Sequence, residues 1–356
     1  MLSKTLVIVC GVRPHYVKAA ALVECLRGSG VRTAVVDARQ QYDPGLTTTV
    51  SEGLGLAFDV TFNHDSLDAA VRASSVYVQL RHLIQDAAIE GERGKVILGF
   101  GDAVSTMMAA VAAASEGVPF VHFEAGVRAL GSVVSVEDQF RRAISQMSSL
   151  NLCMLEQHTA NLVSERAPGV SVVVGDLAGE KVFRQRISNT EMVDEVLCHI
   201  HKAENVTYEG VLAILEAIRS TGYPCTFITH PAVGRIIDEG DIAIPTNVRL
   251  RKPTSHDIFV ELVCRSRIVL TDSGGVQREA FRAGRRCVVR RDSAGWGALF
   301  GPGGHIRVDR TQRLIKDALT AAWNYPQWEL NSPFDGLIRD GVPVLVRELS
   351  EIVRAA

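Results

Sequence analysis

Residues 268–290 read IVLTDSGGVQREAFRAGRRCVVR, and this stretch indicates the fold class. Its first part, Ile268–Leu270, is a short apolar run typical of a buried strand. Val276–Ala283 then has the spacing of an amphipathic helix, and Arg286–Arg290 is a second strand-like run. A strand, a helix and a strand in succession are the building unit of a parallel sheet, so the stretch predicts an α/β fold.

The same alternation of short apolar runs and longer amphipathic stretches extends along the chain on both sides. One series runs from the strand Leu6–Cys10 to the strand Val170–Val174, and a second runs from the strand Val196–Ile200 to the helix Leu314–Trp323. The polar stretch Arg184–Asp194 separates them near residue 180. The two series predict two Rossmann-like, doubly wound domains that face a cleft.

Composition narrows the class of protein. The 356 residues are 47% hydrophobic and 22% charged, which excludes a disordered chain. The 38 basic and 40 acidic side chains leave a formal net charge of −2, so we expect neither nucleic acid nor an acidic membrane as a partner. The arginine-rich segment Arg282–Arg291 still leaves room for a local anion site.

Cysteine usage and the ends of the chain bear on location. The seven cysteines are spread out and never spaced as C-x-x-C, which favours buried thiols in a reducing compartment over disulfides or a zinc site. No apolar run approaches the roughly 18 residues of a membrane span, and the N-terminus lacks a signal-peptide pattern. We therefore expect a cytoplasmic protein without a membrane segment or a metal.

Carboxylates follow two predicted strands of the first series. Asp102 and Glu124 each come just after a strand-like apolar run, where open α/β sheets bind their ligands. Carboxylates crowded at one site differ in proton affinity, as acid–base catalysis requires. Two simpler interpretations stay open: Asp102 caps the next helix, and Glu137 with Arg141, four residues apart, forms a surface ion pair.

The glycines of the opening stretch suit a phosphate site. Ser273, Gly274 and Gly275 stand between strand and helix, where backbone N–H groups and the helix dipole attract an anion. Glu279, farther along this helix, is within reach of a ribose diol. The chain has no G-x-x-x-x-G-K-[ST] motif, so the pattern indicates a nucleotide-diphosphate site without P-loop hydrolysis. A plain glycine-containing helix start is the alternative.

Two cationic or titratable side chains also follow strands. Arg13 comes after Leu6–Cys10, and His201 opens the polar run HKAEN after Val196–Ile200. Arg13 places a permanent cation over the end of the sheet, and His201 is a candidate catalytic histidine at a strand end. A surface arginine and a structural histidine are the alternatives.

Six motifs occur in the order and at about the spacing of one enzyme family. They are GVRP at 11–14, GD at 101–102, HFEAGVR at 122–128, Glu137 with Arg141, HKAEN at 201–205 and TDSGGVQ at 271–277. On these motifs the chain resembles the non-hydrolysing UDP-N-acetylglucosamine 2-epimerases over nearly its entire length.

The resemblance implies the GT-B arrangement of two Rossmann-like domains, with UDP in the cleft between them. The corresponding boundaries are 1–178 for an N-terminal domain with the acid–base carboxylates and 179–335 for a C-terminal, UDP-binding domain. A C-terminal helix in 336–356, around Val344–Arg354, would pack back on the first domain. The resemblance also implies a homodimer and no added cofactor.

The implied reaction interconverts UDP-N-acetylglucosamine and UDP-N-acetylmannosamine. UDP is eliminated across C1–C2 to give 2-acetamidoglucal, and is added back with the C2 proton on the opposite face. The catalytic residues by motif match are Asp102, Glu124, Glu137, Arg141 and His201. Those for UDP and its diphosphate are Arg13, His201, Ser273, Gly274, Gly275 and, at the ribose, Glu279.

Several positions depart from the family pattern. His15 replaces a glutamate, Phe140 an asparagine, Arg39-Gln40-Gln41 a Gly-Gln-His segment, and Ala294–Ala298 a Thr-Glu-Arg-Pro-Glu segment beside the substrate. These changes suggest a specialised pathway, such as antibiotic or surface-glycan synthesis, and weaker activation by a second substrate molecule. A hydrolysing relative that releases N-acetylmannosamine and UDP, a GT-B glycosyltransferase and a nucleotide-sugar binding protein without turnover remain alternatives.

Overall fold

The computed structural model describes residues 5–40, 51, 54–64, 68–85, 95–128, 136–176, 190–291, 299–300, 304–308, 312–325 and 335–356. These residues form two compact units. The first unit holds the described residues up to 128, those from 136 to 176 and those from 335 onward, and the second holds 190–325. The predicted boundary between residues 178 and 179 lies outside the described residues.

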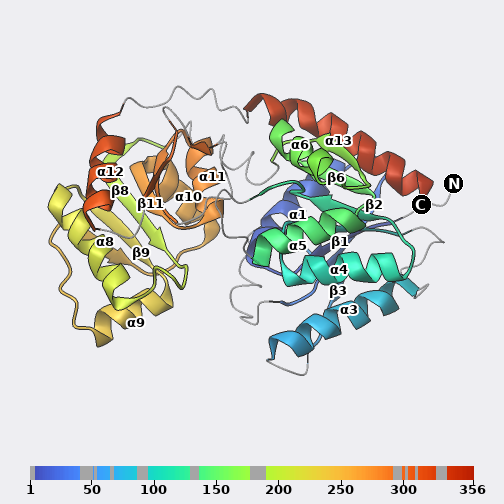
Figure 1. Ribbon diagram of the computed structural model, residues 1–356, viewed down its shortest axis with the longest axis horizontal. Helices are drawn as coiled ribbons and strands as arrows, with labels where there is room; N and C mark the ends of the chain where they lie inside the picture. Colours follow the sequence, from blue (N-terminus) through green and yellow to red (C-terminus); the bar gives the residue numbers. More distant parts are fainter. Residues whose placement is uncertain are drawn as a thin grey trace. The chain divides into compact units, whose positions relative to one another are not determined.

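The first unit is built on a parallel seven-stranded sheet (Figure 1) with the order β3-β2-β1-β4-β5-β6-β7. Its strands are β1 Thr5–Cys10, β2 Arg32–Asp37, β3 Val60–Thr61, β4 Lys95–Phe100, β5 Phe120–Phe123, β6 Leu150–Cys153 and β7 Val170–Val173. Its helices are α1 Arg13–Leu26, α3 Ala69–Gln85, α4 Val104–Ser115, α5 Val136–Met147, α6 Glu156–Ser164 and α13 Asp335–Ala355.

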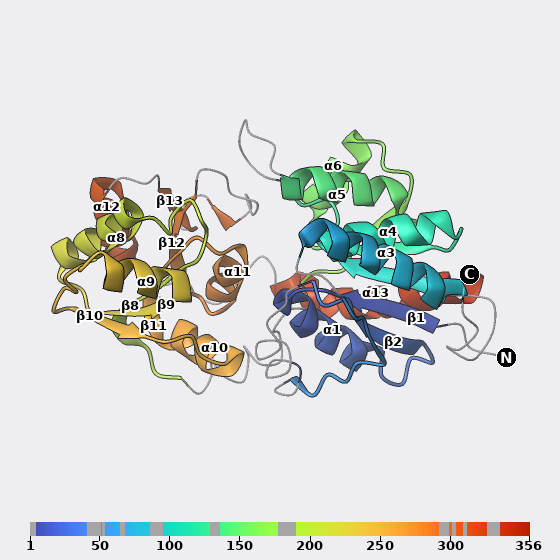
Figure 2. The same ribbon diagram turned by 90° about the horizontal axis from the view of Figure 1, so that it is seen from below.

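Alternate side chains of β1 decide which helices cover each face of this sheet. Leu6 and Ile8 pack in one core cluster with α1 and α13, whereas Val7 and Val9 pack in another with α3, α4 and α5. A strand buried on both faces is typical of a doubly wound parallel sheet. Figure 2 shows α3, α4 and α5 on one side of the sheet and α1 with α13 on the other.

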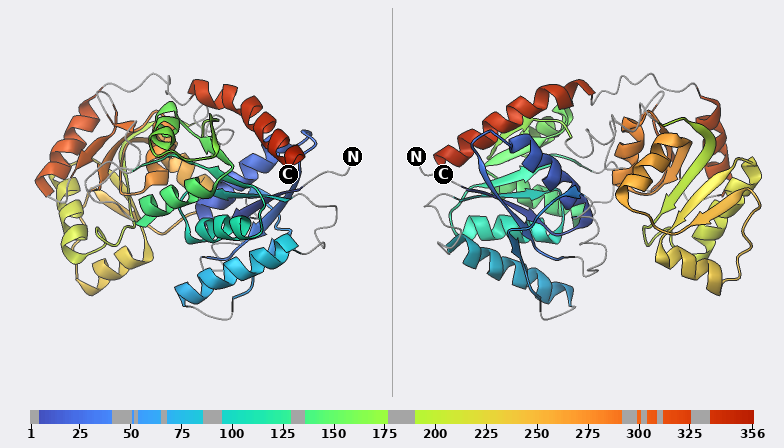
Figure 3. Two further views of the ribbon diagram at one scale, coloured as in Figure 1. Left: turned by 45° about the vertical axis from the view of Figure 1, so that its right-hand side comes forward. Right: turned by 180° about the vertical axis from the view of Figure 1, so that it is seen from behind.

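The C-terminal helix belongs to the first unit. Leu345, Leu349 and Val353, spaced four residues apart, are buried in the same cluster as α1. Figure 3 shows α13 lying along this unit. The return of the C-terminal helix to the first domain is therefore confirmed, although the helix is longer than Val344–Arg354 and contains Pro343.

The second unit is a parallel six-stranded sheet with the order β10-β9-β8-β11-β12-β13. One core cluster joins it to α8, α9 and α12, and another joins its opposite face to α10 and α11. Its strands are β8 Val193–Ile200, β9 Cys225–Thr229, β10 Val248–Arg251, β11 Ser266–Thr271, β12 Arg286–Arg290 and β13 Ile306–Val308. Its helices are α8 Tyr208–Thr221, α9 Pro231–Glu239, α10 His256–Arg265, α11 Gly274–Arg282 and α12 Gln312–Asn324.

The prediction of two doubly wound α/β units is thus confirmed, with additions. Four elements were not predicted: β3, α6, α9 and β13. The strands among them have two and three residues, and α6 and α9 each bury only two side chains, so their hydrophobic period is too short to stand out. The sequence predicts a helix over Asp68–Glu90 for the segment of α3, and its predicted end at Glu90 lies outside the described residues. No helix of the described part is long and apolar enough to cross a membrane.

Candidate active site

The two predicted strand-end carboxylates belong to neighbouring strands. Strands β4 and β5 pair in parallel, with Phe100 opposite Phe123, so Asp102 and Glu124 follow at the same edge of the sheet. Glu124 has φ 65°, in the left-handed region that costs a side chain about 1–2 kcal/mol. Gly101 has φ 61°, and a Cβ there would lie 3.1 Å from Glu124 Oε2. The missing side chain at Gly101 therefore leaves room for the Glu124 carboxylate.

Glu124 forms a buried ion pair that the sequence did not indicate. Lys18 Nζ of α1 donates to Glu124 Oε2 at 2.6 Å, and each side chain is only 6% exposed. The ammonium also lies 6.0 Å from the centre of the Phe100 ring. A buried charge without an opposite charge is strongly destabilising, so this pair fixes both side chains at the strand end.

Asp102 pairs with an arginine of α5. Its Oδ2 lies 2.5 Å from Arg141 Nη2. The interpretation of Asp102 as a helix cap is wrong: the N-cap of α4 is Ala103, without a side-chain hydrogen bond, and the Ser105 N–H is bound by Gln40 Oε1 at 2.8 Å. Arg141 therefore contacts a carboxylate that is distant in the sequence, and the four-residue spacing of Glu137 and Arg141 did not predict this contact.

Competing effects act on the proton affinity of Asp102. Burial raises the pKa of its carboxyl most strongly, the Arg141 guanidinium lowers it, and the Glu124 carboxylate raises it. Lys18 and Glu137 act more weakly, and the net result is a raised pKa. Since Glu137 lies in the first turn of α5, the structure brings all three predicted carboxylates into one electrostatic cluster with Arg141 and Lys18.

His122 supports this cluster as a neutral side chain. Its Nε2 donates to the Gly101 carbonyl at 2.8 Å, and its Nδ1 accepts from the Ser145 hydroxyl at 3.0 Å. Burial lowers the pKa of His122 to about 3, and burial also lowers the pKa of His15 to about 3. Nδ1 of His15 accepts from the Gly11 N–H at 3.3 Å, so the histidine that replaces the family glutamate holds the first strand-end turn.

These histidines predict how the stability of the first unit depends on pH. Their folded pKa values lie below 6.5, so the unfolded chain binds more protons between pH 6.5 and about 3. The contribution of these histidines to the free energy of unfolding is therefore greatest above pH 6.5. As the pH falls, the free energy of unfolding decreases by up to about 1.4 kcal/mol per pH unit for each histidine. Hydrogen exchange of β1 and β4 amides between pH 8 and pH 5 checks this. A protection free energy unchanged by acid would contradict it.

The second unit presents its own cluster at the ends of β8 and β11. These strands pair with His199 opposite Thr271, and Asp272 follows at their shared edge. The buried Asp272 carboxylate accepts the His201 N–H at 3.1 Å, the Lys202 N–H at 2.9 Å and the Asn205 side-chain amide at 2.9 Å. Asp272 therefore fixes the turn that carries His201.

His201 is placed beside the start of α11. Its Nδ1 lies 3.2 Å from Asp272 Oδ1, though without hydrogen-bond geometry, and its side chain is 34% exposed. Burial lowers the pKa of His201, while Asp272 partly opposes this. Its ring also lies 5.3 Å from that of His199, whose pKa burial lowers to about 4. The histidine is therefore mainly neutral at pH 7 and accessible to a ligand.

The predicted phosphate residues lie at the N-terminus of α11. Ser273 is the N-cap, and its hydroxyl accepts from the Val276 N–H at 3.4 Å. A Cβ added at Gly275 would have only the Ser273 hydroxyl within 4 Å, at 3.8 Å. No described neighbour is therefore close enough to exclude a side chain at this position. A ligand that approaches the backbone N–H groups does require a residue without a side chain there. This favours an anion site over a plain helix start.

Glu279 and Arg13 complete the predicted set. Glu279 Oε1 lies 3.0 Å from His256 Nε2 of α10, a partner the sequence did not indicate. Arg13 is the first residue of α1, directly after β1, and is half-buried. Each of the two units therefore carries part of the predicted site at the carboxyl edge of its sheet.

Other features lie away from these strand ends. A groove of about 510 Å³ is lined by residues of the α1–β2 turn, including Arg27 and Arg32, at the opposite edge of the first sheet. Among the described residues no group of three or more His, Cys, Asp or Glu side chains could hold a metal ion. The seven cysteines are thiols. The segment Ala294–Ala298 and residue Gln41 lie outside the described residues.

Replacing Asp272 should lower the stability of the second unit. Asp272→Asn replaces one acceptor oxygen by an amide donor that faces N–H groups, so we expect the free energy of unfolding of the second unit to fall by about 2–3 kcal/mol. Hydrogen exchange of β8 and β11 amides measures it. Asp238→Asn, at an exposed position of α9, is the control and should change little. Equal effects of the two changes would show that the buried hydrogen bonds stabilise nothing.

Known proteins of one enzyme family are similar to this chain in sequence. The family model described as UDP-N-acetylglucosamine 2-epimerase matches residues 24–334. A UDP-2,3-diacetamido-2,3-dideoxy-D-glucuronate 2-epimerase of Pseudomonas aeruginosa is 26% identical over 87% of this chain and 90% of its own length. A UDP-N-acetylglucosamine 2-epimerase of Neisseria meningitidis is 26% identical over 90% of this chain and 91% of its own.

Solved structures share the fold. The Methanocaldococcus jannaschii UDP-GlcNAc 2-epimerase in complex with UDP-GlcNAc and UDP has a TM-score of 0.82 at 22% identity, covering 98% of this chain and 99% of the other. The Neisseria meningitidis UDP-GlcNAc 2-epimerase bound to UDP-GlcNAc has a TM-score of 0.80 at 22% identity, covering 98% and 100%. These likenesses establish the GT-B type of fold expected from the sequence.

Proposed function

Because the chain belongs to the UDP-N-acetylglucosamine 2-epimerase family, a family of isomerases, we propose that it interconverts UDP-N-acetylglucosamine and UDP-N-acetylmannosamine. One observation carries the proposal: two carboxylates at neighbouring strand ends, Asp102 and Glu124, each stand against a different cation. Proton transfer at a sugar carbon needs carboxylates of unlike proton affinity, and their two environments supply that difference.

The proposed reaction removes and restores one proton and one leaving group. A carboxylate takes the C2 proton, the C1–O bond to the diphosphate breaks with both electrons going to UDP, and a C1–C2 double bond forms. Addition reverses these changes: UDP oxygen attacks C1, and C2 receives a proton on the opposite face. The two faces require an acid and a base in different positions, which suits a cluster of carboxylates better than a single one.

We assign the acid–base roles to Asp102, Glu124 and Glu137. Glu124 is paired with the Lys18 ammonium, whereas burial raises the pKa of Asp102 despite the adjacent Arg141 guanidinium. A carboxyl group with a raised pKa donates a proton less readily and accepts one more readily than an ordinary carboxyl, which suits an acid–base role. Arg141 would stabilise the negative charge that develops as the C2 proton leaves.

We assign the binding of the UDP leaving group to a cationic side chain and to N–H donors. Ser273, Gly274 and Gly275 would bind phosphate through the start of α11, and Arg13 and His201 would hold the diphosphate. Glu279 would accept hydrogen bonds from the ribose, with His256 fixing its carboxylate. These donors stabilise UDP when it leaves, which is the second requirement of the elimination.

Location and assembly are part of the proposal. We place the protein in the cytoplasm, supported by its seven cysteine thiols. We expect a homodimer from the family resemblance, and a specialised glycan or antibiotic pathway from the positions that depart from the family pattern. Light scattering on a gel-filtration column tests the dimer. A mass of one chain of 38.6 kDa would contradict it.

Products formed in deuterated water test the activity. The protein is incubated with UDP-N-acetylglucosamine and followed by proton and phosphorus NMR. Deuterium at C2 of an intact UDP-sugar, with UDP-N-acetylmannosamine appearing, is the expected result. Free UDP with free N-acetylmannosamine would mean the hydrolysing reaction. No exchange and no product would leave a transferase or a binding protein, and would contradict the proposal.

A further inference from the structure

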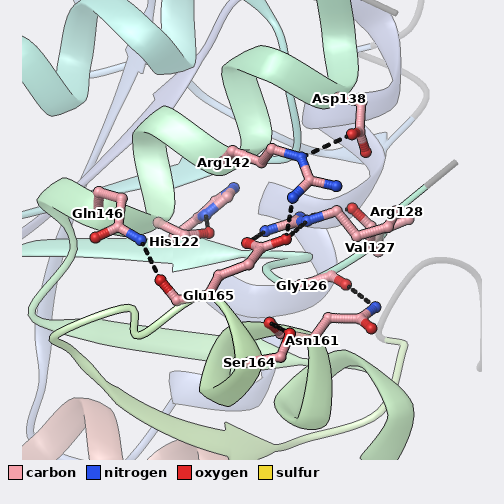
Figure 4. Close-up of polar contacts among 11 residues, drawn as sticks. His122, Gly126, Val127, Arg128, Asp138, Arg142, Gln146, Asn161, Ser164 and Glu165 are labelled. Carbon is pink, nitrogen blue, oxygen red and sulfur yellow. Dashed lines mark hydrogen bonds and ion pairs between the residues drawn. The ribbon is translucent and has the colours of Figure 1, made fainter. Parts of the chain in front are cut away.

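One carboxylate outside the proposed site joins two segments that carry its residues. Glu165 follows α6, and Figure 4 shows it between Arg128 and Arg142. Arg128 donates through Nε at 2.8 Å and Nη2 at 2.5 Å to the two oxygens of this carboxylate. Arg142 donates through Nη1 to Glu165 Oε1. A single side chain therefore binds two guanidinium groups.

This arrangement differs from an ordinary surface ion pair. The side chains of Arg128 and Glu165 are 9% and 18% exposed, and their contact is two-pronged. Such forked contacts fix geometry as well as contributing energy, and solvent screens them less than an exposed pair. Glu165 can therefore hold its partners in fixed positions.

The two arginines lie next to the acid–base residues. Arg128 stands four residues after Glu124, at the end of the turn in which Glu124 has φ 65° and Gly126 φ 75°. Arg142 adjoins Arg141 on α5, and Arg141 is the residue whose guanidinium lies 2.5 Å from Asp102. Glu165 therefore connects the Glu124 turn to the helix that delivers Arg141.

Further contacts from the same region support this connection. Asn161 of α6 donates through Nδ2 to the Gly126 carbonyl at 2.9 Å, and Gln146 of α5 donates to the Glu165 carbonyl at 3.1 Å (Figure 4). A Cβ at Gly126 would collide with the His158 carbonyl, so α6 packs directly on the turn. Arg142 is itself oriented by Asp138, whose Oδ2 accepts from its Nε at 2.9 Å.

We propose that Glu165 is a positioning residue for the acid–base site, holding the Glu124 turn and helix α5 together so that Arg141 stays against Asp102. The inference rests on the proposed function, since it takes Asp102, Glu124 and Arg141 to act on the substrate. The charged groups that act on Asp102 are Arg141, Glu124, Lys18 and Glu137. When Glu165 loses its charge, α5 loosens and the effect of Arg141 on Asp102 weakens.

The test uses Glu165→Gln in the full-length chain, with C2 deuterium exchange as the activity. We expect kcat to fall by about 10- to 100-fold while KM changes by less than about threefold, because geometry rather than binding is lost. The limb of the pH profile that Asp102→Asn abolishes should move to higher pH. Glu165→Asp should recover part of kcat. The control Glu156→Gln, at an exposed position of α6, should behave as the unaltered protein.

The outcomes separate positioning from stability and from the proposed function. Normal kcat and an unmoved pH profile in Glu165→Gln, with or without a lower melting temperature, would overturn the inference. If that variant fails to fold, Arg142→Met alters a side chain 45% exposed: it breaks the contact of α5 with the Glu165 carboxylate, together with the Asp138 hydrogen bond, and leaves Arg128 in place. It should lower kcat in the same way. If the unaltered protein shows no exchange, the proposed function fails. A carbon-13 titration of Asp102 in both proteins then still tests the positioning, with a higher pKa expected in Glu165→Gln.

Discussion

Asp102→Asn is expected to lower kcat for epimerisation by about a hundred- to ten-thousand-fold, the usual contribution of a positioned acid–base group. The amide keeps the shape of the carboxylate and cannot take or give the proton at C2. Deuterium incorporation at C2 should fall in parallel. The affinity for UDP, measured by calorimetry, should change by less than about twofold, since the proposed UDP residues belong to other strand ends.

The control for this variant is Glu24→Gln, which alters a carboxylate on α1 that is 52% exposed and pairs with Arg27. It should leave both kcat and UDP affinity unchanged. If Asp102→Asn lost UDP affinity as strongly as it lost kcat, Asp102 would be a structural residue. The pairing with Arg141 would then serve the fold of the first unit alone.

Lys18→Met is expected to destabilise the first unit by about 3–5 kcal/mol, because it leaves the Glu124 carboxylate buried without its cation. Glu124→Gln combined with Lys18→Met should recover a large part of this loss, since neither buried charge remains. Hydrogen exchange of β1 and β4 amides reports the stability of this unit separately from the second, which unfolding of the whole chain would not.

Arg27→Met, at the C-cap of the same helix, is the matched control, since its side chain is 76% exposed and its ion pair with Glu24 is worth little. An equal, small effect of Lys18→Met and Arg27→Met would show that the Lys18–Glu124 pair is not desolvated in solution. A double variant as unstable as Lys18→Met alone would assign the loss to packing of the lysine stem.

The sequence predicted most strands of the two sheets because strands buried on both faces are continuous apolar runs. Helix boundaries were predicted less accurately: the C-terminal helix was expected around Val344–Arg354, whereas α13 begins at Asp335 and continues through Pro343, a residue type that usually ends a helix. Helix α6 was not predicted, because only His158 and Leu162 of it are buried. Yet α6 leads to Glu165, the residue proposed to position the acid–base site.

The site residues were predicted from their place after strands, and their partners were not. The spacing of Glu137 and Arg141 suggested a local pair, and it gave no sign of the contact that the structure shows between Arg141 and Asp102 of another element. Lys18 was missed because a lysine in an amphipathic helix usually faces water, and only the fold brings Glu124 to it across 106 residues. Sequence position identifies strand ends, but ion pairs across elements depend on packing.

The central claim is that UDP leaves and returns during epimerisation. Its most direct test is UDP-N-acetylglucosamine carrying oxygen-18 in the bond between C1 and the β-phosphate, followed by phosphorus NMR during turnover in deuterated water. We expect the label to move from the bridging to the non-bridging β-phosphate oxygens, because the β-phosphate of free UDP can rotate before UDP adds back. Deuterium should enter C2 in the same molecules. Deuterium at C2 with the label still entirely in the bridge would contradict the account.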